Sequence, residues 1–257
     1  GPPRAQPSRS SSAMEHPQPL PELSPDQQAA VAACLADAAT GRGFRPYLLH
    51  GVTGSGKTEV YLRLIASELA AGRQTLLLVP EIGLTPQLVG RLRARFGTAL
   101  AILHSALTER ERFDAWRSAF REQTKLIVGT RSAVFAPLPA AGLIIVDEEH
   151  DASYKQDEMP RYHGRDVAIV RARRAGALVV LGSATPSLES WQAARDGRYR
   201  LVVLPFNHVA SRPEELGKLL LRAGLDGVLL APPACDQPRH TGIGELNEHL
   251  AALVEDL

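Results

Sequence analysis

Short, continuously apolar runs alternate with amphipathic stretches along most of the chain. Such runs, without polar positions between them, are typical of strands buried on both faces of a parallel sheet. Six segments fit this description: Pro46–His50, Thr75–Pro80, Ala99–Leu103, Lys125–Gly129, Leu143–Asp147 and Ala177–Ser183. Helical character is found in Gln27–Ala39, Glu59–Ala71 and Thr108–Phe120. The repeated strand-then-helix order predicts an α/β fold, an open and mostly parallel sheet with helices on both faces.

The pattern divides the chain into three parts. Residues 1–22 are rich in Pro and Ser, so we expect a disordered leader or linker that cannot bury enough apolar surface to fold. Residues 23–205 carry the alternating pattern and are expected to form one domain. In residues 206–257 the pattern weakens and no motif is found, so this tail is unassigned and could be a partial or divergent domain. Because residue 1 is not Met, we expect the chain either to be a piece of a longer one or to begin naturally at Met14.

Composition narrows the classes of protein. Lys and Arg number 29 against 28 Asp and Glu, a net charge of +1, which argues against a polybasic or an acidic solvating chain. No apolar run approaches the roughly 18 residues that a membrane span needs. The two cysteines, Cys34 and Cys235, cannot form a disulfide framework or a four-ligand zinc site by themselves. These features predict a soluble, cytoplasmic protein without a membrane segment.

The segment GVTGSGKT, residues 51–58, matches the phosphate-binding loop G-x-x-x-x-G-K-[ST] at every position. Its glycines allow backbone N–H groups to point at phosphate oxygens, and the following helix presents its positive N-terminus to the same anion. Lys57 is expected to reach the β- and γ-phosphates, and Thr58 to help hold Mg²⁺. The expected nucleotide contacts in the loop are Gly51, Thr53, Gly54, Ser55, Gly56, Lys57 and Thr58.

An acidic cluster follows the apolar run that ends near residue 146. Asp147 lies where a nucleotide-bound Mg²⁺ needs a carboxylate, and Glu148 is a candidate general base for the attacking water. Without the phosphate loop, a solvated acidic turn would be the better interpretation. The Gly182–Pro186 segment also ends a strand, and its small hydroxyl side chains could hydrogen-bond to His150.

Residues 23–205 resemble the first RecA-like lobe of the replication-restart (primosomal) DNA helicases of superfamily two. Six segments occur in the family's order and spacing. They are an adenine-reading segment with Gln27, two single-strand-contacting segments at Val79–Gln87 and Gly129–Ala133, a DEAH-like box at Asp147–Asp151, an aromatic-rich loop with Ser153–Gln156 and Arg161–His163, and a closing segment at Gly182–Ser187.

The resemblance implies a lobe that binds ATP and Mg²⁺ and couples hydrolysis to movement along single-stranded or forked DNA. It places Lys57, Asp147, Glu148 and His150 among the catalytic residues, and Thr58 and Asp147 at the metal. Its implied partners are primosome and single-strand-binding proteins, and its implied location is the bacterial cytoplasm, at the nucleoid. The DNA contacts that it implies are Gly129, Thr130, Arg131, Ser132, Tyr154, Lys155, Arg161, Tyr162 and His163, whose hydroxyls, cations and aromatic rings suit phosphates and unpaired bases.

Three departures from the family pattern leave alternatives open. An aromatic residue usual in the loop is replaced by Met159 or Pro160. The family's zinc-binding region, which would supply its zinc sites, is absent. So is the second lobe, which supplies an arginine to the transferring phosphate, and losing such an arginine costs about 10³–10⁵ in rate. The alternatives are a truncated lobe that binds ATP or DNA without turnover, and a non-catalytic module that binds DNA or a primosome partner.

Overall fold

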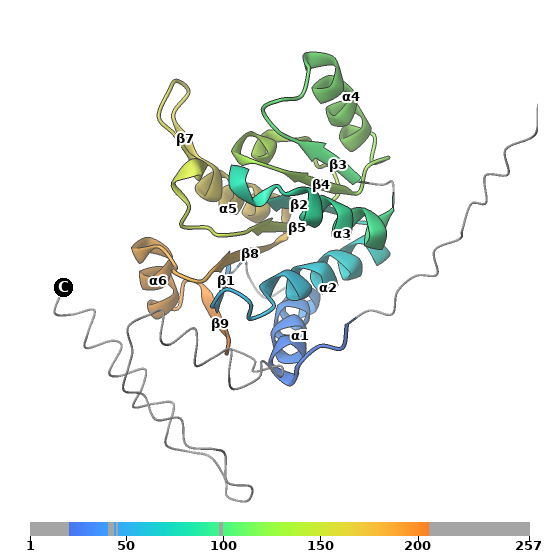
Figure 1. Ribbon diagram of the computed structural model, residues 1–257. Helices are drawn as coiled ribbons and strands as arrows, with labels where there is room; N and C mark the ends of the chain where they lie inside the picture. The colour runs from blue at the N-terminus through green and yellow to red at the C-terminus, as the bar shows by residue number, and fades with distance from the viewer. Residues whose placement is uncertain (1–20, 41–43, 45, 98–99, 206–257) are drawn as a thin grey trace, which may run out of the picture. The chain divides into compact units, whose positions relative to one another are not determined.

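The computed structural model describes residues 21–40, 44, 46–97 and 100–205 (Figure 1). The tail at 206–257 and nearly all of the leader at 1–22 lie outside the described residues. The described part begins with one helix and continues as alternating strands and helices, as the apolar pattern predicts. None of the helices within these ranges has the length and the apolar character that crossing a bilayer requires.

Seven parallel strands form one sheet in the order β3-β4-β2-β5-β8-β1-β9. The six predicted strands are all present, each within two residues of its expected bounds. The seventh, β9, was not predicted. The strands are β1 (Tyr47–Gly51), β2 (Gln74–Leu78), β3 (Leu100–Leu103), β4 (Leu126–Gly129), β5 (Ala141–Val146), β8 (Leu178–Ser183) and β9 (Arg200–Leu204).

Two hydrophobic clusters lie on opposite faces of the sheet. Successive residues of a strand alternate between them: in β5, Leu143 and Ile145 belong to one cluster, and Ile144 and Val146 to the other. This alternation explains why the strands are apolar at every position. Helices on both faces complete the clusters, which confirms the predicted fold class.

Helices α1 (Pro25–Thr40), α2 (Lys57–Ala70) and α3 (Pro86–Phe96) pack on one face of the sheet. The helices α4 (Glu109–Phe120) and α5 (Gly164–Ala175) contribute side chains to the other cluster. A sixth helix, α6 (Leu188–Arg195), follows β8. The start of α4 is set by a capping box, in which Thr108 and Glu111 satisfy each other's backbone N–H groups.

A short antiparallel hairpin stands apart from the main sheet. It consists of β6 (Lys155–Gln156) and β7 (Tyr162–His163), and it projects between the 3₁₀ turn η3 (Ala152–Tyr154) and the start of α5. Figure 1 shows it as a protruding loop on the side of α5. The hairpin corresponds to the segment that the sequence identifies as an aromatic-rich loop.

Candidate functional site

The phosphate loop joins the C-terminal end of β1 to the N-terminus of α2. Gly54 and Gly56 have φ values of +84° and +87°, a left-handed conformation that residues with a Cβ rarely adopt. Ser55 N donates to Val52 O, which closes the turn. The loop therefore has the strand-turn-helix context that the motif requires, and its backbone leads directly into the positive end of a helix.

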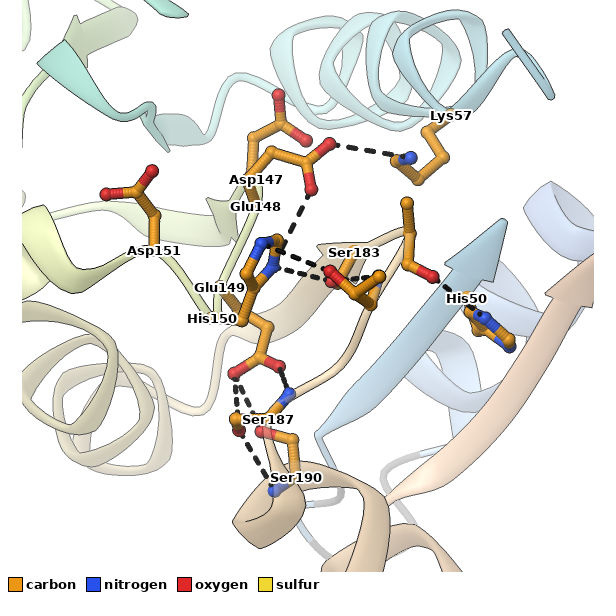
Figure 2. A network of polar contacts seen from close by, with 12 residues as sticks. His50, Lys57, Asp147, Glu148, Glu149, His150, Asp151, Ser183, Ser187 and Ser190 are labelled. Carbon is orange, nitrogen blue, oxygen red and sulfur yellow. Dashed lines mark hydrogen bonds and ion pairs between the residues drawn. The ribbon is translucent and has the colours of Figure 1, made fainter. Parts of the chain in front are cut away.

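Lys57, the lysine of the loop, is buried and held by the chain itself. Its Nζ donates to Gly51 O at 2.7 Å and forms an ion pair with Glu148 Oε1 at 3.5 Å (Figure 2). Nearby, Ser55 Oγ is buried and has no hydrogen-bond partner among the described residues. No atom lies within 4 Å of the position that a Cβ on Gly54 would take, so the backbone is open to a ligand there. These features fit a bound phosphate.

Gln27 lies against the loop from α1. Its Nε2 donates to Ser55 O at 3.3 Å, while Ser24 N donates to its Oε1 at 2.9 Å. A Cβ on Gly56 would lie 2.0 Å from Gln27 Nε2, so the glycine is required both for its conformation and for this contact. The structure therefore brings the predicted adenine-reading residue to the edge of the loop.

The acidic cluster directly follows β5 and faces the loop. Asp147 N donates to Leu78 O of the neighbouring strand, which aligns the cluster with the strand ends. Glu148 has a φ of +45°, an unfavourable conformation for a residue with a side chain, and it forms the ion pair with Lys57. The structure thus joins two predicted catalytic residues that are 91 positions apart.

Tyr61, which the sequence did not single out, donates from its hydroxyl to Asp147 Oδ1 at 2.9 Å. Burial raises the pKa of Asp147, and the hydrogen bond from Tyr61 acts in the opposite direction. Burial, followed by the charge of Asp147, raises the pKa of Tyr61 well above its usual value. The tyrosine therefore stays protonated and orients one oxygen of the carboxylate. No sequence signal marks it, because it occupies an ordinary core position of α2.

His150 connects the acidic cluster to the segment after β8. Its Nδ1 lies 2.8 Å from Ser183 Oγ, and its Nε2 lies 3.2 Å from Thr185 Oγ1. The predicted contact between His150 and the small hydroxyl side chains is therefore confirmed (Figure 2).

Glu149, between two residues that face the site, points away from it and is fully buried (Figure 2). Its carboxylate accepts hydrogen bonds from Arg165 Nη1, Ser187 N, Ser187 Oγ and Ser190 Oγ at 2.7–3.1 Å. These donors come from the N-terminal parts of α5 and α6. Sequence reasoning missed this role, because nothing in a run of acidic residues shows which one turns inward.

A metal ion at this site would need ligands from the nucleotide. Among the residues that the structure describes, no group of three His, Cys, Asp or Glu side chains could hold a metal ion. Mg²⁺ is commonly bound by one or two carboxylates together with phosphate oxygens. Asp147 at the strand end and Thr58 in the first turn of α2 fit that arrangement.

The predicted DNA-contacting segment after β4 is only partly at the surface. Gly129 and Thr130 are buried, and Thr130 N donates to Leu103 O, so these two predicted DNA contacts do not reach the surface in this structure. Arg131 Nη1 donates to the carbonyls of Ser153 and Lys155 at 3.0 and 2.5 Å, so this guanidinium holds the chain around η3. Ser132, the next residue, is exposed.

The structure also contradicts the stacking role expected of Tyr154. This residue is 0% exposed, so it offers no face to a base, and its hydroxyl donates to Asp147 O at 2.7 Å. Its aromatic ring belongs to a hydrophobic cluster, which is the reason it cannot stack on a base. The other predicted contacts of the hairpin reach the surface: Lys155 and Arg161 are exposed, and Tyr162 and His163 are partly exposed.

This fold and this site define a RecA-like P-loop ATPase lobe, with a phosphate loop and an acidic box at the carboxyl edge of a parallel sheet. The chain belongs to the DEAD/DEAH box helicase family, whose model matches residues 24–194.

Its curated relatives include proteins named replication restart protein PriA. The chain is 50% identical to that of Bacillus subtilis over 187 residues, which cover 73% of this chain and 23% of the relative. It is 52% identical to that of Haemophilus influenzae over 162 residues (63% and 22%) and 42% identical to that of Treponema pallidum over 219 residues (85% and 32%). The chain thus spans about a quarter to a third of the length of these relatives.

Among solved structures, RecG bound to a three-way DNA junction aligns with a TM-score of 0.56 at 22% identity, over 80% of this chain and 28% of that one. This likeness supports the fold.

Proposed function

We propose that this chain is the ATP-binding lobe of an ATP-dependent DNA helicase that acts in replication restart and couples ATP hydrolysis to movement along single-stranded DNA. The observation that carries the proposal is the ion pair of 3.5 Å between Lys57 and Glu148, because it places the phosphate lysine beside the candidate base. The relatives named replication restart protein PriA support the same reading. By that likeness, primosome and single-strand-binding proteins are the proposed partners, at the bacterial nucleoid.

The phosphate loop would bind the triphosphate through its backbone N–H groups. Lys57 would exchange Gly51 O and Glu148 for β- and γ-phosphate oxygens, a stronger set of partners for an ammonium group. Gln27 would contact the adenine, since it is already fixed against the loop. Glu148, released from Lys57, would then orient the attacking water as general base.

Mg²⁺, when bound with the nucleotide, neutralises charge on the β- and γ-phosphates. Asp147 would hold it, with one carboxylate oxygen oriented by Tyr61, and Thr58 would contribute its hydroxyl. A change in the position of His150 on nucleotide binding would move the segment after β8, because His150 contacts Ser183 and Thr185.

Single-stranded DNA would contact a surface formed by the exposed or partly exposed residues after β4 and in the hairpin, which we call the proposed DNA surface. These residues are Ser132, Lys155, Arg161, Tyr162 and His163. The same surface is connected to the nucleotide site by two side chains, the partly buried Arg131 and the fully buried Tyr154. Arg131 holds the carbonyls on either side of Tyr154, and the Tyr154 hydroxyl holds the Asp147 carbonyl. A displacement of the hairpin by DNA would therefore move the backbone of the metal-binding residue.

Measurements of ATP binding and hydrolysis, with and without single-stranded DNA, test the proposal. The proposal requires Mg²⁺-dependent ATP binding that Lys57→Ala removes without unfolding the chain. DNA-stimulated ATP hydrolysis that Lys57→Ala removes would show that the chain also turns over ATP. DNA binding that is indifferent to both ATP and Lys57→Ala would contradict it and favour a non-catalytic module. Nucleotide binding without turnover would favour a lobe that needs an arginine from outside the described residues.

A further inference from the structure

Helix α4 turns an apolar stripe toward solvent. Phe113, Trp116 and Phe120 follow each other at helical spacing, and they are 63%, 37% and 67% exposed. Ala119 is the residue of α4 that is buried. An aromatic stripe of this kind on a helix that already packs on a sheet indicates a binding surface more often than a solvated face.

Two adjoining hollows lie beside this stripe. The larger, of about 260 Å³, lies between α4 and the ends of β3 and β4, and its lining includes Trp116, Phe135 and Ser132. The smaller, of about 230 Å³, is formed by α4 alone, with Phe113 and Trp116. Both hollows share Trp116 and Arg112. We call the surface formed by Phe113, Trp116, Phe135 and Arg112 the α4 groove.

The charge of the α4 groove favours an anionic occupant. Arg112 has no ion pair within the described ranges, whereas its neighbour on the same helix, Arg110, pairs with Asp114 at 4.0 Å. No acidic side chain lines the larger hollow, and Glu109 lines only the smaller one. A guanidinium without an ion pair that lines the same hollows as aromatic rings matches a ligand that combines negative charge with flat apolar groups.

The groove continues onto the proposed DNA surface. Phe135 lines the larger hollow and contacts Tyr162 of the hairpin edge-to-face, with ring centroids 4.9 Å apart. Tyr162 is flanked by Arg161 and paired across the hairpin with Gln156, next to Lys155. Aromatic rings with cations between them thus extend from the hairpin to α4, which is the construction of a surface that binds single strands.

We infer that the α4 groove binds single-stranded nucleic acid, with one base stacked on Trp116 and the adjoining phosphate held by Arg112. The inference rests on the proposed function and extends it, because it lengthens the DNA path beyond the segments that the sequence identifies. Duplex DNA does not fit this role, since its bases are already stacked on each other.

Intrinsic fluorescence tests the inference directly. The chain has two tryptophans, so a Trp191→Phe background leaves Trp116 as the single reporter. Titration with oligo(dT) at low salt is expected to quench this fluorescence in parallel with the anisotropy of a labelled oligonucleotide. Trp116→Ala in the wild-type background is expected to weaken binding about tenfold, and Trp116→Phe to restore most of it, because a ring remains for stacking. Trp116 is partly exposed, so these changes do not empty a core site.

Arg112→Gln is expected to lower the affinity and to reduce the slope of log K against log salt by about one. Arg110→Gln, on the same helix but paired with Asp114, is the matched control and should change the affinity and the salt slope much less. If oligo(dT) binds by anisotropy but the Trp116 fluorescence is unchanged, DNA binding in the α4 groove is contradicted, while the proposed function still stands. If oligo(dT) does not bind at all, both DNA binding in the α4 groove and the DNA part of the proposed function are contradicted. ATP binding is tested independently by the Lys57→Ala measurement.

Discussion

Neighbouring glutamates of the acidic cluster have opposite environments. Glu148 lies at the surface of the site and pairs with Lys57, whereas Glu149 is buried and accepts hydrogen bonds from three different residues. Glu148 can therefore act as the proposed general base, whereas the carboxylate of Glu149 is occupied by its hydrogen bonds. Two isosteric substitutions, one at each position, separate these roles.

Glu148→Gln is expected to leave the free energy of unfolding nearly unchanged and to lower the rate of ATP hydrolysis about 10²–10⁴-fold, since a general base contributes a factor of this size. ATP affinity is expected to stay the same or to rise, because Lys57 loses a competing carboxylate. Single-turnover kinetics and nucleotide titration measure the two effects. Unchanged hydrolysis would remove Glu148 from the proposed mechanism.

Glu149→Gln is expected to lower the free energy of unfolding by about 1–3 kcal/mol, because the largely buried Arg165 would lose its buried partner and keep only the ion pair with the exposed Asp166. Urea denaturation measures the loss. Glu189→Gln, at an exposed position of α6, is the control and should change the stability by less than about 0.5 kcal/mol. An equally small effect for Glu149→Gln would show that the network around Arg165 does not stabilise the fold.

His163 makes the stability of the hairpin region dependent on pH. Burial lowers the pKa of its imidazole below the usual 6.5, and the charge of Arg165 lowers it further. The carboxylates of Asp166, Glu149 and Glu189 act in the opposite direction. The unfolded chain therefore binds the proton more readily than the folded chain. It follows that stability is complete above about pH 6.5 and falls as the pH drops through this value.

His163→Gln should remove this part of the pH dependence. Chemical denaturation at about pH 7.5 and about pH 5.5 measures the difference in the free energy of unfolding. The wild-type chain should lose more stability at the lower pH than the variant does. Equal losses in the wild type and in His163→Gln would contradict the role assigned to this histidine.

At the scale of elements, the contact between α2 and β8 is unusually close. A Cβ on Gly182 of β8 would lie 1.6 Å from the Tyr61 hydroxyl oxygen. Gly182→Ala must therefore displace Tyr61, and with it the hydrogen bond to Asp147. We expect a loss of about 1–3 kcal/mol in stability, typical of an overpacked core, together with weaker Mg²⁺-dependent ATP binding.

Tyr61→Phe removes the oxygen in this clash, so the double variant should be more stable than the sum of the two single effects predicts. Gly90→Ala is the control for the added methyl group, since nothing lies within 4 Å of its Cβ position on α3. It should be neutral or slightly stabilising. Thermal or urea denaturation of the wild type, the two single variants and the double variant completes the cycle, and strict additivity would contradict the proposed clash.

The strands that bury both faces could be predicted from the sequence, whereas the edge strand β9 and the short hairpin strands could not. The six predicted strands are apolar at nearly every position because each one lies between two hydrophobic clusters. Strand β9 lies at the edge of the sheet with Leu201 and Val203 exposed, so its composition carries a weaker signal. The hairpin strands are two residues long and depend on contacts such as Arg131 with Lys155, which no local pattern reveals.

The same distinction holds for the site. The phosphate loop, Glu148 and His150 could be located because their chemistry is concentrated in short motifs. Tyr61 could not, because its partner Asp147 is 86 positions away. Tyr154 was assigned to a DNA contact because it lies in the segment that resembles the family's aromatic-rich loop, yet its hydroxyl turns inward to the Asp147 carbonyl.

At the scale of the whole molecule, the parallel sheet gathers distant segments at one edge. Gln27, Lys57, Asp147 and Ser183 come from α1, α2 and the ends of β5 and β8, and they surround the same loop. A nucleotide bound there would contact several elements of one cooperative domain. Its binding energy should therefore stabilise the domain as a whole.

Mg²⁺-ATP at about 100 times its dissociation constant is expected to stabilise the chain by about 2.7 kcal/mol. For a domain of this size, that corresponds to a rise in Tm of about 5–10 °C. Lys57→Ala should abolish the rise while leaving the Tm without nucleotide close to that of the wild type, because Glu148, which loses its ion pair, is partly exposed and can be solvated by water. Thermal unfolding with Mg²⁺-ATP, with ATP and a chelator, and without nucleotide measures both effects. A nucleotide-dependent rise that persists in Lys57→Ala would place the nucleotide outside the phosphate loop, because binding in the loop requires this lysine.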